Sequence, residues 1–344
     1  MRKMIILTFA LLLIGNFAIA QNSDILVQKF INYNLSEEKY NIKINYDSFT
    51  EKGYKKQKVF KKVITTLNQL ENNSGYTGKE LIKAIQQTRD TATIIPPQYG
   101  DSVEYSLKTM EIAPPYLYEK KFITGFAHES RHHVQNDVLK KHNYNAGDYA
   151  EIVRNPKFYF LVRFLSEADA YARQYTINEI LKLKGKNLPS KEEELQMLSK
   201  HFEKFFNKDS SGLEKLYRKI FFGSHNNTFS FYNYSKNFMK RSKKIYKFMN
   251  YVMDEDPNIF FEELPMIDKE SFCKKKEYID TTKLVQLFTQ IGDENYFPQK
   301  NSKFSNEEQL INHITNSFNK YLENKGEFSL EERQEIYQEF CSKF

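Results

Sequence analysis

Two apolar stretches of this chain carry ionisable side chains at positions that a helix would turn inward. Residues 122–138 contain His128 and His132 among aromatic and aliphatic residues, and the strongly apolar run 158–172 contains Glu167. A buried charge without a partner is so unfavourable that the group shifts its pKa or becomes neutral. The two stretches are therefore expected to pack so that these groups meet a partner, and a metal ion would be such a partner.

The spacing of the two histidines favours a metal site on one face of a helix. His128 and His132 are four residues apart, so both imidazoles can bind one ion at Zn–N distances of about 2.0 Å. Glu129 lies about 100° round the helix, outside the ligand plane but near enough to reach a water on the ion. This is the position that a general base needs, so the motif indicates a catalytic zinc site.

A catalytic zinc site has three protein ligands and one position for water, so the chain must supply another ligand. Glu167 is the expected third ligand, and the small side chains of Ala168, Ala170 and Ala172 would let its helix pack closely against the first. Asp169 is the alternative. It lies about 200° from Glu167 on a helix, so only one of the two carboxylates can face the metal.

The segments 126–135 and 163–174 resemble an uncharacterised bacterial metallopeptidase family. Its pattern is His-Glu-x-x-His with a Gln three residues further on, followed by Glu-Ala-Asp-Ala-x-Ala. More broadly, the chain is similar to the gluzincins, in which the third zinc ligand is a Glu on a following helix. The resemblance covers about residues 55 to 185 and leaves the C-terminal part unassigned.

This resemblance implies one zinc ion held by His128, His132 and Glu167, with Glu129 as the catalytic base. The chain departs from the gluzincins at one position. They commonly carry Asp or Asn four residues after the ligand Glu, bonded to a ligand His, whereas this chain has Tyr171. The groups that orient the ligands therefore cannot be carried over from the family.

Four further residues are candidates for supporting roles. Gln135 returns to the ligand face, where it could orient a ligand or a substrate amide, or simply be polar at a helix contact. Asp169, if not a ligand, would support the site or form a salt bridge with Arg163. His225 and Tyr232 lie downstream, where a donor for the oxyanion of the scissile carbonyl is expected.

The order of local patterns before the histidine motif favours a zincin-like domain. Helical spacing at about 55–72 and 78–89 is followed by two β-like runs, 91–95 and 103–112, and then by the helix that bears His128. The last part of the second run, Lys108 to Ile112, is expected to be the edge strand. An extended substrate could add to such an edge by backbone hydrogen bonds.

The predicted fold class is α+β and predominantly helical. A zincin-like upper domain with a small edge sheet and an active-site helix is expected over residues 21–185, and a helical domain over 190–344. The segment Gly185-Lys186-Asn187-Leu188-Pro189-Ser190 is the predicted linker. The zinc cleft is expected where the two halves meet.

Residues 1–20 read as a secretory signal peptide. A basic start precedes a short apolar stretch and the ending Ala18-Ile19-Ala20, and that stretch is too short to span a membrane comfortably. A periplasmic or secreted protein, with no stable membrane insertion after cleavage, is therefore expected. In such an oxidising compartment Cys273 and Cys341 could pair, although free thiols are an open alternative.

The charge balance does not by itself indicate a nucleic-acid partner. The chain has 51 Lys and Arg against 44 Asp and Glu, a net charge of +7, with basic clusters at 240–244 and 274–276. Export argues against nucleic acid, so solvated helix faces are the preferred interpretation. The expected partner is a peptide or protein substrate, and the oligomeric state is left open.

The function predicted from the sequence is hydrolysis of peptide bonds by a zinc-activated water, with Glu129 as the base. One alternative within enzymes is a zinc amidase that acts on cell-wall peptides. A different class is a non-catalytic exported protein that binds metal or a partner. The presence of Glu129 disfavours that class, because a purely structural site needs no base.

Overall fold

The computed structural model describes residues 36–96, 103–106, 109–112, 117, 119, 121–145, 150–183, 187–208, 210–222, 238–265 and 267–344. The predicted signal peptide and the predicted oxyanion donors His225 and Tyr232 lie outside these residues. Among the helices that are described, none is both long and apolar enough to cross a membrane.

A small sheet with its covering helices forms the N-terminal part. Its elements are β1 (Ile42–Ile44), α2 (Tyr46–Glu51), α3 (Lys56–Asn73), α4 (Gly75–Gln86), β2 (Ala92–Ile95), β3 (Val103–Ser106) and β4 (Thr109–Ile112). The strand order is β1-β2-β4-β3, in which β1, β2 and β4 are parallel and β3 is antiparallel to β4. Alternate residues of β1 and β2 are buried, as a half-covered sheet requires.

The prediction for the run 103–112 was wrong in two respects. The run forms two antiparallel strands, with Ser106 paired to Thr109, rather than one strand. The predicted edge strand, β4, lies inside the sheet between β2 and β3, and the two edge strands are β1 and β3. Apolar residues stand at odd positions from Val103 to Leu107 and at even positions from Met110 to Ile112. This shift in the alternation coincides with the reversal of the chain and was overlooked in the sequence.

The rest of the described chain is almost entirely helical. The elements are α5 (Phe122–Lys141), α6 (Ala150–Arg154), α7 (Pro156–Lys182), α8 (Lys191–Phe206), α9 (Ser210–Tyr217), the π-helix η2 (Arg218–Phe222), α11 (Phe238–Met253), α12 (Ile259–Glu263), α13 (Lys269–Cys273), α14 (Thr281–Phe288), β5 (Gln290–Ile291), β6 (Glu294–Asn295), α15 (Glu307–Glu323) and α16 (Leu330–Cys341). The predicted α+β class, predominantly helical with a small sheet, is confirmed.

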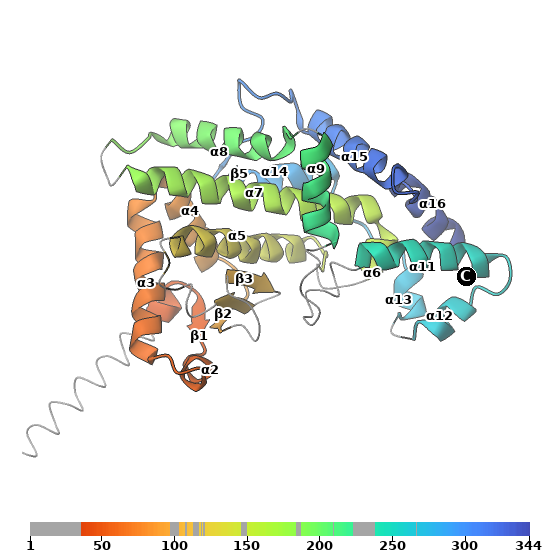
Figure 1. Ribbon diagram of the computed structural model, residues 1–344, viewed down its shortest axis with the longest axis horizontal. Helices are drawn as coiled ribbons and strands as arrows, with labels where there is room; N and C mark the ends of the chain where they lie inside the picture. Colours follow the sequence, from red (N-terminus) through yellow and green to blue (C-terminus); the bar gives the residue numbers. More distant parts are fainter. Residues whose placement is uncertain are drawn as a thin grey trace, which may run out of the picture.

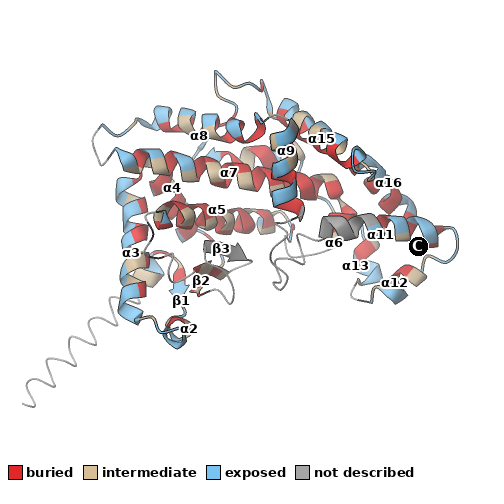
Figure 2. Ribbon diagram, in the orientation of Figure 1, coloured by how far each residue is buried: buried red, intermediate tan, exposed pale blue. Residues whose placement is uncertain are grey.

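The layers follow one another from the sheet outward, as Figure 1 shows. β3 lies against α5, α5 packs on α7, and α7 packs on α8. The apolar residues form two clusters, and α7 contributes to both: Phe158 to Ala172 belong to the larger C-terminal cluster and Ile177 to the N-terminal one. Because both faces of α5 and α7 are covered, these two helices are buried over most of their length (Figure 2). The domain division at 185–190 stays a prediction.

A buried carboxylate joins α8 to the start of α4. Glu194 accepts hydrogen bonds from the backbone N–H groups of Tyr76 and Thr77, at 2.8 and 2.7 Å. These N–H groups have no partner within a helix, and the positive end of the helix dipole favours the negative charge. Gly75 has φ of +67° and its hydrogen faces Glu194, where a Cβ would lie only 2.1 Å from Oε1. Glycine is therefore required there.

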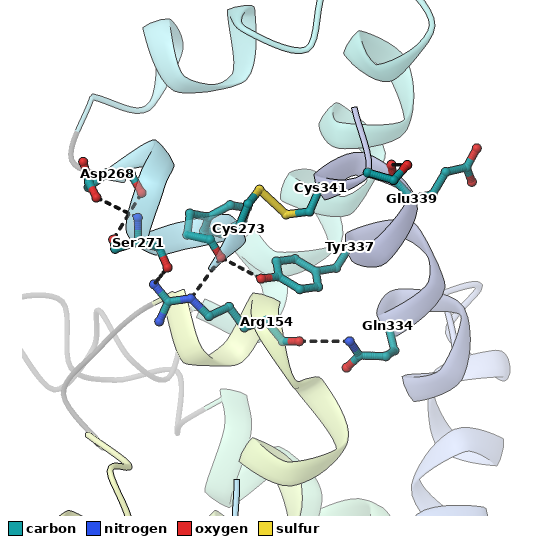
Figure 3. The surroundings of a disulfide bond; sticks show 10 residues. Arg154, Asp268, Ser271, Cys273, Gln334, Tyr337, Glu339 and Cys341 are labelled. Carbon is teal, nitrogen blue, oxygen red and sulfur yellow. Dashed lines mark hydrogen bonds between the residues drawn. A yellow bond between two sulfur atoms is a disulfide. The ribbon is translucent and has the colours of Figure 1, made fainter. Parts of the chain in front are cut away.

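Cys273 and Cys341 form a disulfide between the ends of α13 and α16 (Figure 3). Hydrogen bonds surround it. Tyr337 Oη donates to the carbonyl of Phe272 at 2.6 Å, and Arg154 Nε donates to the same oxygen at 3.1 Å. Of the two alternatives for these cysteines, the structure has the bonded one.

Candidate metal centre

The candidate ligands come from the two central helices. α5 runs through the motif without a break, so His128 and His132 project from the same face, and His128 is 7% exposed. α7 begins where Asn155 accepts a hydrogen bond from the N–H of Phe158 and Pro156 occupies the first turn. From there α7 continues through Glu167, which the packing of α7 on α5 brings opposite the two histidines.

The three side chains converge on one point. His128 Nε2 and His132 Nε2 are 3.1 Å apart, and the Glu167 carboxylate oxygens lie 3.6 Å from His128 Nε2 and 3.7 Å from His132 Nε2. Two donors at tetrahedral positions about 2.0 Å from a zinc ion lie about 3.3 Å apart. The observed spacings bracket that value, so His128, His132 and Glu167 fit one tetrahedral ion.

Glu129 lies beside this group without belonging to it. Its Oε1 is 4.0 Å from His128 Nε2, and its side chain is 17% exposed. The carboxylate is thus close to one of the three donors and, like Glu167, partly exposed to solvent. A group in that position can exchange a proton with a water held at the open side of the site.

Gln135 fixes the protonation of one ligand. His132 Nδ1 lies 2.8 Å from Gln135 Oε1, and an amide oxygen can only accept, so the nitrogen donates. The lone pair of His132 then resides on Nε2, which faces the other two ligands. Gln135 Nε2 donates in turn to the Ser166 carbonyl at 3.0 Å and to Asp169 Oδ2 at 2.8 Å. Such contacts orient a metal-binding imidazole and increase its basicity.

Asp169 lies away from the two histidines, among buried cations. It accepts hydrogen bonds from Arg131 Nε, from Arg173 Nε at 3.1 Å and from the hydroxyl of Tyr296. Arg131 also donates to the Phe288 carbonyl at 2.9 Å, and Arg173 to the Gln290 carbonyl at 2.8 Å. Asp169 is 0% exposed, and its single negative charge offsets part of the two positive charges of the guanidinium groups.

Tyr171 occupies the position at which gluzincins commonly carry Asp or Asn. Its ring meets the His128 ring edge to face, with centroids 4.5 Å apart. His128 Nδ1 is buried and makes no hydrogen bond to any described residue. His128 is therefore held by packing against an aromatic ring, whereas His132 is held by a hydrogen bond.

The field of the site keeps His132 and Glu167 in the forms that bind a cation. Burial lowers the pKa of His132 to about 4, so this imidazole is neutral at pH 7. Burial raises the pKa of Glu167, but His132, His128 and Arg163 together hold it well below its ordinary value. Burial also lowers the pKa of His128, but Glu167 and Glu129 outweigh it and raise that pKa overall. This shift favours the protonated form of His128, so His128 would have to release a proton when a metal binds. A neutral imidazole and an ionised carboxylate are what a metal requires of its ligands.

The structure brings together His128, Glu129, His132, Gln135 and Glu167, and it places Asp169 one hydrogen bond further from the histidines. Sequence reasoning missed Arg131, Arg173 and Tyr296 as partners of Asp169. The only signal for the arginines was their position three or four residues along a helix from a site residue, which many surface arginines share.

Comparison of the chain with protein-family models, with curated proteins and with solved structures finds no match in any of the three. The family resemblance seen in the sequence therefore stays a prediction, and the functional argument depends on the geometry of the site.

Proposed function

We propose that this protein is an exported zinc-dependent peptidase of gluzincin type, with His128, His132 and Glu167 as ligands and Glu129 as base. The observation that carries the proposal is the convergence of three donors at tetrahedral spacing, with the partly exposed carboxylate of Glu129 beside them. A structural metal site would use four protein ligands and would need no neighbouring base.

The residues divide the chemistry between them. A zinc ion bound there would lower the pKa of water from about 15.7 toward 7 and polarise the scissile carbonyl. Glu129 takes the proton of the attacking water and passes it to the leaving amine. Gln135 keeps His132 in the tautomer whose lone pair faces the ligand group, and the buried Asp169 holds Gln135 in place.

The sheet offers a place for an extended substrate. Among the described strands, β3 pairs with β4 alone and lies against α5, the helix that bears the histidines. A peptide that adds to the outer edge of β3 would be held by backbone hydrogen bonds alongside the site. The substrate-binding edge is thus β3 and not the later strand predicted from the sequence.

The disulfide supports export. Bonds such as Cys273–Cys341 persist in oxidising compartments and are rare in reducing ones. Together with the predicted signal peptide, this supports a periplasmic or secreted enzyme acting on peptides or proteins there.

The test compares the mature wild type with Glu129→Gln and with Glu335→Gln, a matched change of an exposed carboxylate on α16. All three chains should bind one zinc ion by elemental analysis. Wild type and the α16 variant should hydrolyse casein or a fluorogenic peptide library, and Glu129→Gln should lose at least about 100-fold in rate. A wild type that takes up no zinc on reconstitution refutes the metal site. One that binds zinc but cleaves nothing favours the non-catalytic class.

A further inference from the structure

An exposed lysine lies directly over the tyrosine that packs against the metal site. Lys219 belongs to η2, the single turn of π-helix that follows α9, whose next residues Ile220 and Phe221 are buried in the core. Its Nζ donates to Tyr171 Oη at 3.2 Å and lies 5.6 Å from the centre of the tyrosine ring. Turns of π-helix are rare and occur often at functional sites, where the extra residue reorients a side chain.

Tyr171 connects this ammonium group to the candidate ligands. The tyrosine ring is in contact with His128, and Lys219 is within electrostatic reach of Glu167. Burial lowers the pKa of Lys219, but the hydrogen bond to Tyr171 and the charge of Glu167 raise it overall, so the side chain is positively charged at pH 7. Lys219 is exposed, whereas the candidate ligands are largely covered.

A second lysine extends the positive charge. Lys208, just after α8, has its Nζ 5.6 Å from the ring centre of Phe205, and that ring stacks on Tyr171 with centroids 5.8 Å apart. Lys208 and Lys219 therefore lie over neighbouring rings, and burial and the charge of Lys219 lower the pKa of Lys208. No carboxylate in the described part of the chain forms an ion pair with either lysine.

We propose that Lys219, with Lys208 beside it, binds a negatively charged group of the substrate, so that the site selects peptides with a carboxylate close to the scissile bond. This inference rests on the proposed function. Two like charges over neighbouring rings repel each other, and an anion bound beside them would relieve that repulsion. A neutral amide of the same shape would not. The aromatic rings of Tyr171 and Phe205 limit the positions that such a group can take.

Binding rather than turnover gives the sharpest test. The Glu129→Gln chain, which retains the ligands but not the base, is titrated into two fluorescein-labelled octapeptide pools, identical except for Glu or Gln at one central position. Fluorescence polarisation should show about fivefold tighter binding of the Glu pool, the upper end expected for a solvent-exposed ion pair. Adding Lys219→Met should bring the ratio close to one, and adding Lys219→Arg should retain the preference.

The control is Lys215→Met in the same background. Lys215 is an exposed lysine of α9, one turn before Lys219, and its loss lowers the net charge by the same amount. If general attraction to a basic protein caused the preference, both methionine variants would reduce it equally. Equal binding of the two pools, a preference that survives Lys219→Met, or no binding of either pool overturns the inference.

Zinc analysis of the same chains, and hydrolysis of the same two peptide pools by the wild type, separate this inference from the proposed function. A wild type that hydrolyses peptides without regard to the Glu or Gln position leaves the peptidase proposal intact and refutes the role of Lys219. A chain that shows the Lys219-dependent preference but takes up no zinc refutes the metal site and leaves an anion-binding site.

Discussion

Glu167 and Asp169 lie two residues apart on α7, and removing the charge of each should have a different effect. We expect one change to weaken zinc binding and the other to lower stability. Glu167 faces His128 and His132, whereas Asp169 accepts hydrogen bonds from two arginines and a tyrosine. The isosteric changes Glu167→Gln and Asp169→Asn remove one negative charge each and keep the volume of the side chain. The pair therefore separates a metal ligand from a structural anion.

The cost of Asp169→Asn follows from its surroundings. The change leaves Arg131 and Arg173, 5% and 2% exposed, without their carboxylate partner. Removing one partner of a buried ion pair costs about 3–5 kcal/mol. Because both arginines keep a backbone carbonyl as acceptor, we expect the lower end, about 3 kcal/mol. Zinc affinity should fall only about tenfold, through the weakened hold on Gln135.

Glu167→Gln should show the opposite pattern. Among the described residues, the ion pairs of Glu167 are with His128 and His132 and not with a fully charged guanidinium group. We therefore expect Glu167→Gln to lower the free energy of unfolding without metal by less than Asp169→Asn does. The loss of one of three ligand charges should weaken zinc binding by at least about 100-fold.

Two assays decide between these expectations. Urea unfolding of the chelated chains gives the change in the free energy of unfolding, and competition with a chromophoric chelator gives zinc affinity under native conditions. Our assignment is refuted if Asp169→Asn releases the metal while Glu167→Gln retains it. It is also refuted if Asp169→Asn leaves the free energy of unfolding unchanged, because the buried ion pairs would then contribute nothing.

Three further predictions concern the supporting residues. Burial raises the pKa of Asp169, but Arg131, Arg173 and Tyr296 together hold this pKa below its ordinary value of 3.8. The ionised carboxylate therefore stabilises the fold above pH 3.8, and this stabilisation is lost as the pH falls below that value. The difference in urea stability between wild type and Asp169→Asn should therefore shrink between pH 6 and pH 3, and a constant difference would contradict this. Gln135→Leu should lower zinc affinity about 10- to 100-fold with all ligands intact, measured by chelator competition; unchanged affinity would mean that Gln135 does not orient His132. Replacing both Cys273 and Cys341 with Ser should lower the free energy of unfolding by about 4 kcal/mol in urea, because the bond closes a loop with a sequence separation of 68, while zinc content should not change.

Local patterns in the sequence were sufficient for the parts of this protein that depend on neighbours along the chain. The separation of four between His128 and His132 places them on one helical face wherever the helix packs. The apolar stretches around them and around Glu167 predicted two buried helices, which α5 and α7 are. The predominance of helices could be recognised in the same way, because helical periodicity is a property of short segments.

Contacts between distant segments were decided only by the tertiary structure. Helical geometry allowed Glu167 or Asp169 to face the histidines, and the arginines and Tyr296 that surround Asp169 show why it does not. Tyr296 is 127 residues from Asp169, and the carbonyl of Phe288 is 157 residues from Arg131. The position of Lys219 over Tyr171 likewise requires η2 to lie next to α7. A periodic pattern reports which face of a helix is buried, but not which of many equally apolar or polar partners will cover it, because that choice depends on how the whole chain packs.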